Sequence, residues 1–350
     1  MRPGAARDVQ ECPGVGIASR DELANPLGLG AIVLPVVEEV VQLGALVNTS
    51  ASLSFVLSCR SPTRASWGAA VNLCKGHAMA LELMAESQRE RLRLTFGADA
   101  ERYDRVRPAY PAKLFDDLAE LACIGPGCRV LEIGLGTGQA TIPIAERGCQ
   151  LTGVELSAEL AAVAQRKLSA FPNVSIVVAA FEDWPLPGRP FDTIVSATAF
   201  HWIDPSVRVT KAADALRSRG ALATIDTHHV AGGTADFFVE AQDCYERWDP
   251  ATPAGLRLSA ADDIPSNSEE LDRSGRFGTA VFRRYEWEAD HSTAEYRDLL
   301  LTYSGHIALE PVARDGLLGC IGDLIDSRYG GRITKRYLTE LRIAETRRCS

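Results

Sequence analysis

The residues best suited to chemistry form a glycine-rich turn, Glu132-Ile133-Gly134-Leu135-Gly136-Thr137-Gly138, directly after an apolar run. Glycine has no Cβ, so such a turn lets a ligand approach the backbone closely. A dinucleotide fingerprint, G-x-G-x-x-G, needs glycine at position 139, but Gln139 stands there and Gly138 comes one residue earlier. The spacing therefore favours a loop that packs against a nucleoside over one that holds a pyrophosphate.

Five apolar runs and the helices between them must position this turn. We predict strands over residues 129–134, 151–155, 174–180, 191–197 and 221–227. The third run, Val174–Ala180, is mostly apolar, which is typical of a strand covered on both faces of a sheet. Helices are predicted over 140–147, after the N-cap Ser157, and between the N-cap Asp204 and Gly220. The alternation indicates a doubly wound α/β sheet.

The flanking segments are less regular. Helices are predicted over 232–248 and 296–301, and strands over 277–287 and 333–344. Just after Met84, Glu86, Arg89, Glu90, Arg91 and Arg93 predict a helix with a solvated face.

The turn closely resembles the first motif of class I S-adenosylmethionine-dependent methyltransferases, which matches Val130-Leu131-Glu132-Ile133-Gly134-Leu135-Gly136-Thr137-Gly138. Two further stretches are similar to a small-molecule, methyltransferase type 11-like branch of the family. The Y-D-x-x-R-P-x-Y-P segment of that branch resembles Tyr103-Asp104-Arg105-Val106-Arg107-Pro108-Ala109-Tyr110-Pro111. The His-Trp pair of that branch resembles the end of Ser196–Trp202. The resemblance covers about residues 84–347. It implies a Rossmann-like, mostly parallel seven-stranded sheet with a helical cap, S-adenosyl-L-methionine as cofactor, and methyl transfer to a small-molecule acceptor by in-line displacement.

The same resemblance implies a set of cofactor-binding residues. Glu155, 21 residues after Gly134, stands where the family has a carboxylate that accepts both ribose hydroxyls, and a carboxylate can accept two O–H donors at once. Its alternative role is that of an acid at a helix start. Tyr103 and Arg107 are implied at the methionyl end, with Arg107 as partner of the carboxylate or, alternatively, in a surface ion pair. The full expected set is Tyr103, Arg107, Glu132, Gly134, Gly136, Gly138, Glu155, Leu156, Phe181 and Glu182.

The adenine contact departs from the family pattern. The acid that many members carry after the third strand is replaced by Ala180, with Phe181, Glu182 and Asp183 following. Adenine recognition is then expected from Phe181, by its ring and backbone, or from the Glu182 or Asp183 side chain; we favour Glu182.

His201 is the candidate catalytic residue. A general base is needed when the acceptor atom carries a proton, and histidine titrates near neutrality. The alternative is that His201 orients a loop or packs under Trp202. His228 and His229 are adjacent on a predicted strand and point to opposite faces, so we expect no shared metal ion.

Composition sets the broader limits. With 350 residues and 46% hydrophobic residues, the chain is globular and somewhat long for a single core. A net charge of −9 argues against nucleic-acid and anionic-membrane partners. We find no signal peptide and expect no membrane span. The nine cysteines are odd in number and scattered, which indicates free thiols in a cytoplasmic protein. The oligomeric state is left open.

These observations divide the chain into an extension and one domain. Residues 1–83 form an extension with no assigned function, expected to have little structure, and Met84 is a hypothetical biological start. Residues 84–350 form the methyltransferase domain: cap helices over 84–127, a cofactor-binding core over 128–227, and a C-terminal cap with the last strands over 228–350. Two alternatives stay open: an NAD-type oxidoreductase, which Gln139 disfavours, and a non-catalytic module that keeps the cofactor fold.

Overall fold

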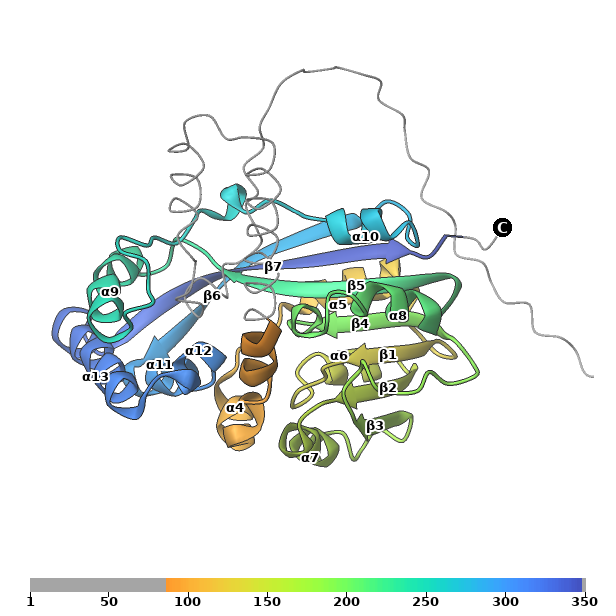
Figure 1. Ribbon diagram of the computed structural model, residues 1–350, viewed down its shortest axis with the longest axis horizontal. Helices are drawn as coiled ribbons and strands as arrows, with labels where there is room; N and C mark the ends of the chain where they lie inside the picture. Colours follow the sequence, from red (N-terminus) through yellow and green to blue (C-terminus); the bar gives the residue numbers. More distant parts are fainter. Residues whose placement is uncertain (1–85, 348–350) are drawn as a thin grey trace, which may run out of the picture. The chain divides into compact units, whose positions relative to one another are not determined.

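A computed structural model of the chain describes residues 86–347 (Figure 1). The predicted extension over residues 1–83 lies outside the described residues, so the domain boundary at Met84 stays a prediction. Residues 86–93 are helical, and among the described residues no helix has the length and apolar character needed to cross a bilayer.

Seven strands form one sheet in the order β3-β2-β1-β4-β5-β7-β6 (Figure 1). β1 through β5 pair in parallel, whereas β7 runs antiparallel to both β5 and β6. The prediction of a mostly parallel, doubly wound seven-stranded sheet is confirmed. The strands are β1 (Arg129–Ile133), β2 (Gln150–Glu155), β3 (Val174–Val178), β4 (Phe191–Ala197), β5 (Leu216–His229), β6 (Val281–Ser292) and β7 (Arg332–Glu345).

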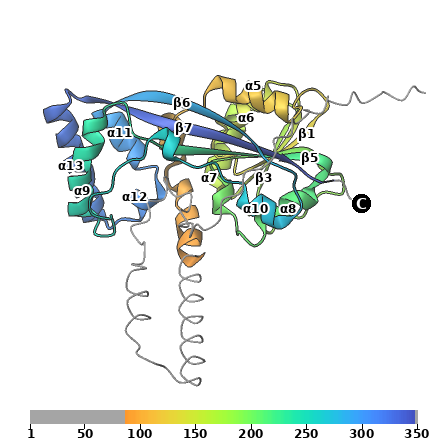
Figure 2. The same ribbon diagram turned by 90° about the horizontal axis from the view of Figure 1, so that it is seen from above.

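Helices cover both faces of the sheet because neighbouring strand residues point to opposite sides. On one face, Val130 of β1 packs with Leu118 of α5 and Ile144 of α6; on the other, Leu131 packs in a cluster with Ala212 of α8 and Leu271 of α10. Figure 2 shows these two helix layers on either side of the strands. The helices of this part are α4 (Ala100–Val106), α5 (Ala112–Leu121), α6 (Thr141–Ala145), α7 (Ala158–Lys167), α8 (Arg208–Ala215) and α10 (Glu269–Ser274), with the short 3-10 helices η1 (Phe96–Asp99), η2 (Phe200–Trp202) and η3 (Ala261–Asp263).

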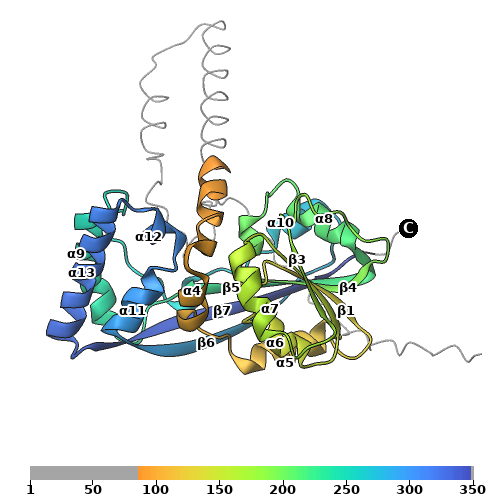
Figure 3. The same cartoon turned by 90° about the horizontal axis from the view of Figure 1, so that it is seen from below.

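A helical cap with its own apolar core stands at the far end of β6 and β7. Its core joins Phe237, Leu299, Leu317 and Ile321, all fully or almost fully buried. In Figure 3, α4 lies between this cap and α7. The cap helices are α9 (Ala235–Trp248), α11 (Thr293–Leu300), α12 (Ser304–Ala308) and α13 (Pro311–Arg328), and α13 was not expected from the sequence.

Several helices begin or end at the residues that the sequence predicts. The Ser157 side chain caps α7 by accepting from the Leu160 N–H at 3.2 Å. Pro143 is tolerated because it lies in the first turn of α6, where no intrahelical N–H bond is lost. Gly148 follows that helix with φ +77°, the left-handed conformation that glycine adopts at helix ends.

Two predictions about elements are wrong. α8 begins at Arg208 rather than after Asp204, because Asp204 caps a preceding turn by accepting from the Ser206 N–H at 2.8 Å. That helix ends at Ala215, and Gly220 lies inside the long strand β5. The apolar run of β3 is not covered on both faces: β3 is the edge strand, and Val178 is 54% exposed.

The expectation of free thiols is also wrong for three of the described cysteines, because Cys123, Cys244 and Cys320 are disulfide-bonded. Cys244 of α9 and Cys320 of α13 form a disulfide across the cap. Their spacing of 76 residues gave no sequence signal, because the pairing depends on how the two helices pack. Cys128 and Cys149 are free.

Candidate functional site

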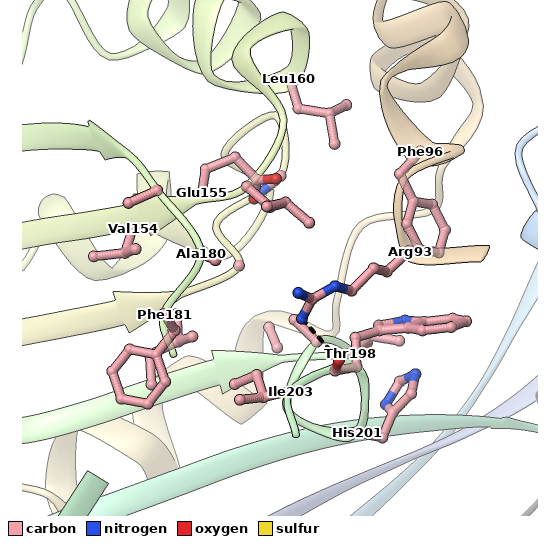
Figure 4. Close-up of a pocket in the computed structure, with 18 of the residues that line it drawn as sticks. Arg93, Phe96, Val154, Glu155, Leu160, Ala180, Phe181, Thr198, His201 and Ile203 are labelled. Carbon is pink, nitrogen blue, oxygen red and sulfur yellow. Dashed lines mark hydrogen bonds between the residues drawn. The ribbon is translucent and has the colours of Figure 1, made fainter. Parts of the chain in front are cut away.

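The carboxyl ends of β1, β2, β3 and β4 open into a pocket whose empty volume is about 960 Å³ when the open solvent at its mouth is included (Figure 4). In open α/β sheets ligands bind at this edge, where the chain order reverses between β1 and β4. The wall combines the residues after these four strands with a cover from the N-terminal helices, including Phe96 and Tyr103. Of the predicted site residues, the pocket is lined by Tyr103, Arg107, Gly134, Gly136, Glu155, Leu156, Phe181, Glu182 and His201.

The glycine turn has the backbone geometry that its sequence predicts. Gly134 and Gly136 have φ of +71° and +57°, and both line the pocket. A Cβ on Gly134 would lie 2.4 Å from the Ala199 Cβ, so the close approach of these two loops requires glycine. Gly138 also has a positive φ, +92°, but it lies against Leu168 of the α7 side rather than at the pocket surface.

Glu155 ends β2 at the pocket wall and is held by two backbone donors. The N–H of Gly136 donates to one carboxylate oxygen and the N–H of Ser157 to the other, each at 2.9 Å. Burial raises the pKa of Glu155, and these backbone hydrogen bonds oppose the rise. The residue is 6% exposed. The two backbone hydrogen bonds therefore hold a buried carboxylate beside the glycine turn.

Glu132, which was expected to bind cofactor, lies beneath the turn and not among the described residues that line the pocket. It is 1% exposed, and one of its oxygens makes no hydrogen bond to the described residues. Burial raises the pKa of Glu132 to about 8, and the charge of Glu155 adds to the effect. Glu132 is therefore a neutral acid at pH 7.

Arg93 reaches into the pocket and pairs with Glu182, contrary to the predicted solvated face. Its Nη1 donates to Glu182 Oε1 at 2.6 Å, and both side chains are about 15% exposed. The Asp204 N–H donates to the same oxygen at 3.0 Å. Burial alone would raise the pKa of Glu182, but its own backbone N–H, that of Asp204 and Arg93 outweigh it and hold the pKa below its usual range. Figure 4 shows the Arg93 side chain extending into the middle of the pocket.

Aromatic rings close the same side. Phe96 packs edge-on against Tyr103 and Trp202, with ring centroids 6.3 and 5.2 Å apart. The Arg107 guanidinium lies over the Tyr103 ring at 4.9 Å, and its Nη2 donates to the carbonyl of Thr302 at 2.8 Å. The pocket thus has an aromatic cover drawn from the Y-D-x-x-R-P segment and from η2.

Thr198, which the sequence reading did not single out, has a strained backbone in the pocket wall. Its φ is +52°, which is uncommon for a β-branched residue. The Thr198 N–H donates to the Ile225 carbonyl at 2.7 Å, and its hydroxyl bonds the Tyr110 hydroxyl at 2.9 Å. A threonine in the sequence gives no sign of such backbone strain, because the strain depends on contacts with residues distant in the chain.

His201 lies in η2 and lines the pocket. Burial lowers its pKa, Arg208 and His228 lower it further, and Asp226 opposes them. The imidazole is therefore neutral at pH 7 and able to accept a proton. Its ring lies 5.1 Å from that of Trp202, so the packing expected as its alternative role is also present. The neighbouring histidine on β5, His229, bonds the Tyr303 hydroxyl at 3.3 Å. The described residues contain no group of three or more His, Cys, Asp or Glu side chains that could hold a metal ion.

Comparison with known proteins places residues 130–220 in the methyltransferase domain family. An uncharacterised methyltransferase of Mycobacterium tuberculosis is 32% identical over 137 residues, which cover 39% of this chain and 54% of that protein. One from Geobacillus kaustophilus is 33% identical over 137 residues, covering 37% and 63%. The chain spans about half the length of the mycobacterial relative.

The chain therefore contains a methyltransferase domain over residues 130–220. Among solved structures it is similar to Haemonchus contortus phosphoethanolamine N-methyltransferase 2, at 17% identity and a TM-score of 0.43, over 72% of this chain and 58% of that one. It is also similar to a Bacillus subtilis protein at 18% identity and a TM-score of 0.42, over 69% and 100%. The matched residues of this chain run from β1 into β5, the part that carries the glycine turn, Glu155 and His201.

Proposed function

We propose that this methyltransferase binds S-adenosylmethionine in the pocket beside the glycine turn and transfers its methyl group to a small-molecule acceptor. The observation that carries the proposal is Glu155, a buried carboxylate fixed at the end of β2 by the N–H groups of Gly136 and Ser157. Backbone donors use part of each oxygen's accepting capacity and leave the rest for ligand hydroxyls. A ribose with two vicinal hydroxyls suits that arrangement.

The residues present fit such a cofactor along its length. Gly134 and Gly136 leave room for a close approach of the ligand to the backbone. Phe181 and Ala180 offer an apolar surface for a planar base at the β3 side.

The Arg93–Glu182 pair supplies polar recognition at that side. Adenine presents an amino donor beside ring-nitrogen acceptors, so an adjacent carboxylate and guanidinium offer the complementary acceptor and donor. This assigns adenine recognition to Glu182 with Arg93 as its partner.

Tyr103 and Arg107 line the opposite part of the pocket and are proposed to hold the methionyl end. The guanidinium of Arg107 is oriented by its stacking on Tyr103 and by its bond to Thr302, and a planar fork of donors suits a carboxylate.

When bound, the sulfonium cofactor supplies the electrophilic methyl group. The protein's own contribution is to position the acceptor, exclude water with the aromatic cover, and receive a proton when the acceptor atom carries one. We assign the last task to His201, whose lowered pKa keeps its nitrogen unprotonated at neutral pH. Because chemistry of this kind needs no charged surface, the acidic chain fits a small acceptor better than a nucleic acid.

Two titrations of the full chain test the proposal. We expect S-adenosylhomocysteine to bind with micromolar affinity by calorimetry and NADH to show no binding; the opposite pattern would favour an oxidoreductase. Methyl transfer is then measured with tritiated S-adenosylmethionine against a panel of small oxygen, nitrogen and carbon acids, with tRNA and DNA as macromolecular alternatives. Incorporation into nucleic acid alone would overturn the small-molecule assignment, and binding with no transfer to any acceptor would favour the non-catalytic module.

A further inference from the structure

A second cavity lies in the C-terminal cap, with an empty volume of about 600 Å³ when the open solvent at its mouth is included. α9 contributes Phe238 and Tyr245 to its wall, α11 contributes Tyr296, and β5 and β7 contribute His229 and Lys335. We call it the cap pocket. It shares no lining residue with the cofactor pocket, so it is a separate site.

A buried lysine is its most unusual feature. Lys335 is 3% exposed and lies on the inner face of β7. Its Nζ lies 5.6, 5.4 and 5.4 Å from the ring centroids of Tyr296, Tyr303 and Tyr337. Burying an ammonium group is costly, and the faces of three tyrosines offset part of that cost. An ammonium group has three N–H donors, so it can bind a ligand beside the contacts that it makes within the protein.

Apart from the cationic Arg257 at the rim, the other titratable side chains of the cap pocket are neutral. Burial lowers the pKa of His229 well below its usual value, and Lys335 and Arg107 lower it further. Burial raises the pKa of Tyr245 and of Tyr296, so both hydroxyls stay protonated. The described lining contains two cationic side chains, Lys335 inside and the exposed Arg257 at the rim, and no carboxylate.

Much of the remaining wall is apolar, with Gln242 and Thr252 as its polar members. Leu256, Leu258, Leu300 and Ala241 face the cavity together with the tyrosine rings. Such a lining suits the body of an apolar or aromatic molecule, whereas the lysine suits a single negative charge.

Arg107 connects the cap pocket to the cofactor pocket. Its guanidinium lies between two rings, 4.9 Å from the Tyr103 centroid and 4.6 Å from that of Tyr303. Tyr103 lines the cofactor pocket and Tyr303 lines the cap pocket, so the stack Tyr103–Arg107–Tyr303 is the partition between them.

From this arrangement we propose that the cap pocket is a binding site for a small organic carboxylate with an apolar or aromatic body. Its carboxylate bonds to the Lys335 ammonium group and to the neutral donors near it, and its body packs on Tyr245, Tyr296 and the leucines. A phosphate monoester fits less well, because its second charge meets only one buried cation. The proposal concerns binding and holds whether or not the cofactor pocket acts as proposed above.

Calorimetry of the full chain with benzoate, and with benzamide as its neutral isostere, tests this site. We expect benzoate to bind at least tenfold more tightly than benzamide, and Lys335→Met to remove that preference. The matched control is Lys113→Met, which changes an exposed lysine paired with Asp117 on α5 and is expected to leave benzoate affinity within twofold. Equal affinities for the two probes in the unaltered chain would overturn the proposal.

A second variant keeps the test decisive if Lys335→Met fails to fold. Leu256→Trp places a large ring in the cavity from the outer loop and leaves the lysine in place; we expect at least a tenfold loss of benzoate affinity. Saturating S-adenosylhomocysteine should leave benzoate binding intact in the unaltered chain. Benzoate binding that is insensitive to Leu256→Trp but is abolished by the nucleoside would place benzoate in the cofactor pocket and contradict the proposal.

Discussion

The guanidinium of Arg93 and the carboxylate of Glu182 meet at 2.6 Å, although the two residues are 89 positions apart. The contact joins the first described helix to the loop after β3 and crosses the proposed adenine side of the pocket. Because the pair is largely shielded from water, each partner depends on the other for its charge compensation.

Breaking this pair should weaken base recognition. In Arg93→Met and in Glu182→Gln we expect S-adenosylhomocysteine to bind roughly ten- to a hundredfold more weakly, the scale of a lost charge-assisted hydrogen bond. We also expect both variants to lose discrimination against S-inosylhomocysteine, in which a carbonyl replaces the adenine amino group. Calorimetry with both ligands gives the two values.

The control for that pair is Arg91→Met, on the same helix but exposed. Its affinities should match those of the unaltered chain. Unchanged discrimination between the two nucleosides in Glu182→Gln would remove the pair from adenine recognition, even if overall affinity fell.

Gly134→Ala should damage both stability and binding. The new Cβ meets Ala199 at 2.4 Å, and φ of +71° disfavours any side chain. We expect a loss of about 1–3 kcal/mol in the free energy of unfolding, measured by urea titration. Gly125→Ala is the matched control, since its Cβ would meet nothing within 4 Å; equal stabilities of the two variants would contradict the close approach of the loops.

Glu132 should make stability depend on pH. Its folded-state pKa of about 8 is above the ordinary value of 4.5, so the folded chain binds the proton more tightly than the unfolded chain. The stabilisation is complete below pH 4.5 and is lost as pH rises toward 8, by roughly 3–5 kcal/mol in total. Urea titrations of the unaltered chain and of Glu132→Gln at pH 5.5, 7 and 8.5 measure it. We expect the variant to lack this decline; two parallel pH profiles would mean that Glu132 is already ionised in the folded chain.

The disulfide of the cap should contribute stability without affecting the cofactor pocket. Cys244 and Cys320 close a loop of 76 residues, which restricts the unfolded chain. We expect the double variant Cys244→Ser/Cys320→Ser to lose about 2–4 kcal/mol in the free energy of unfolding and to keep its nucleoside affinity. Cys128→Ser, which changes a free thiol, is the comparison. A double variant as stable as that control would show that the disulfide does not contribute.

The sequence predicted the core of the fold because its signals are local. The glycine turn, the N-cap Ser157 and the alternation of apolar runs each reflect neighbouring residues. The strands β1 to β4 formed within about two residues of their predicted ends, whereas β5 begins at Leu216 rather than at Ala221. The predictions were wrong where the structure depends on residues that are distant in the sequence. Val174–Val178 lies at the sheet edge because of strand order, which an apolar run does not encode.

In the site, too, the residues that local motifs mark were predicted, and those that depend on distant contacts were not. Glu155 and the glycines at 134 and 136 were found because one motif and its spacing place them at the same sheet edge. Arg93 was misjudged as solvated, since its partner Glu182 is distant in sequence. Thr198 was missed because backbone strain depends on the contacts with Tyr110 and Ile225, and the Cys244–Cys320 pairing depends on helix packing in the cap.

The role of Glu155 is the most direct test of the whole account. Calorimetry with S-adenosylhomocysteine compares the unaltered chain, Glu155→Ala and the exposed control Glu146→Ala. We predict at least a tenfold loss of affinity in Glu155→Ala and no change in Glu146→Ala, because only the former removes the acceptor for the ribose hydroxyls. An unchanged affinity in Glu155→Ala would contradict the proposed cofactor site.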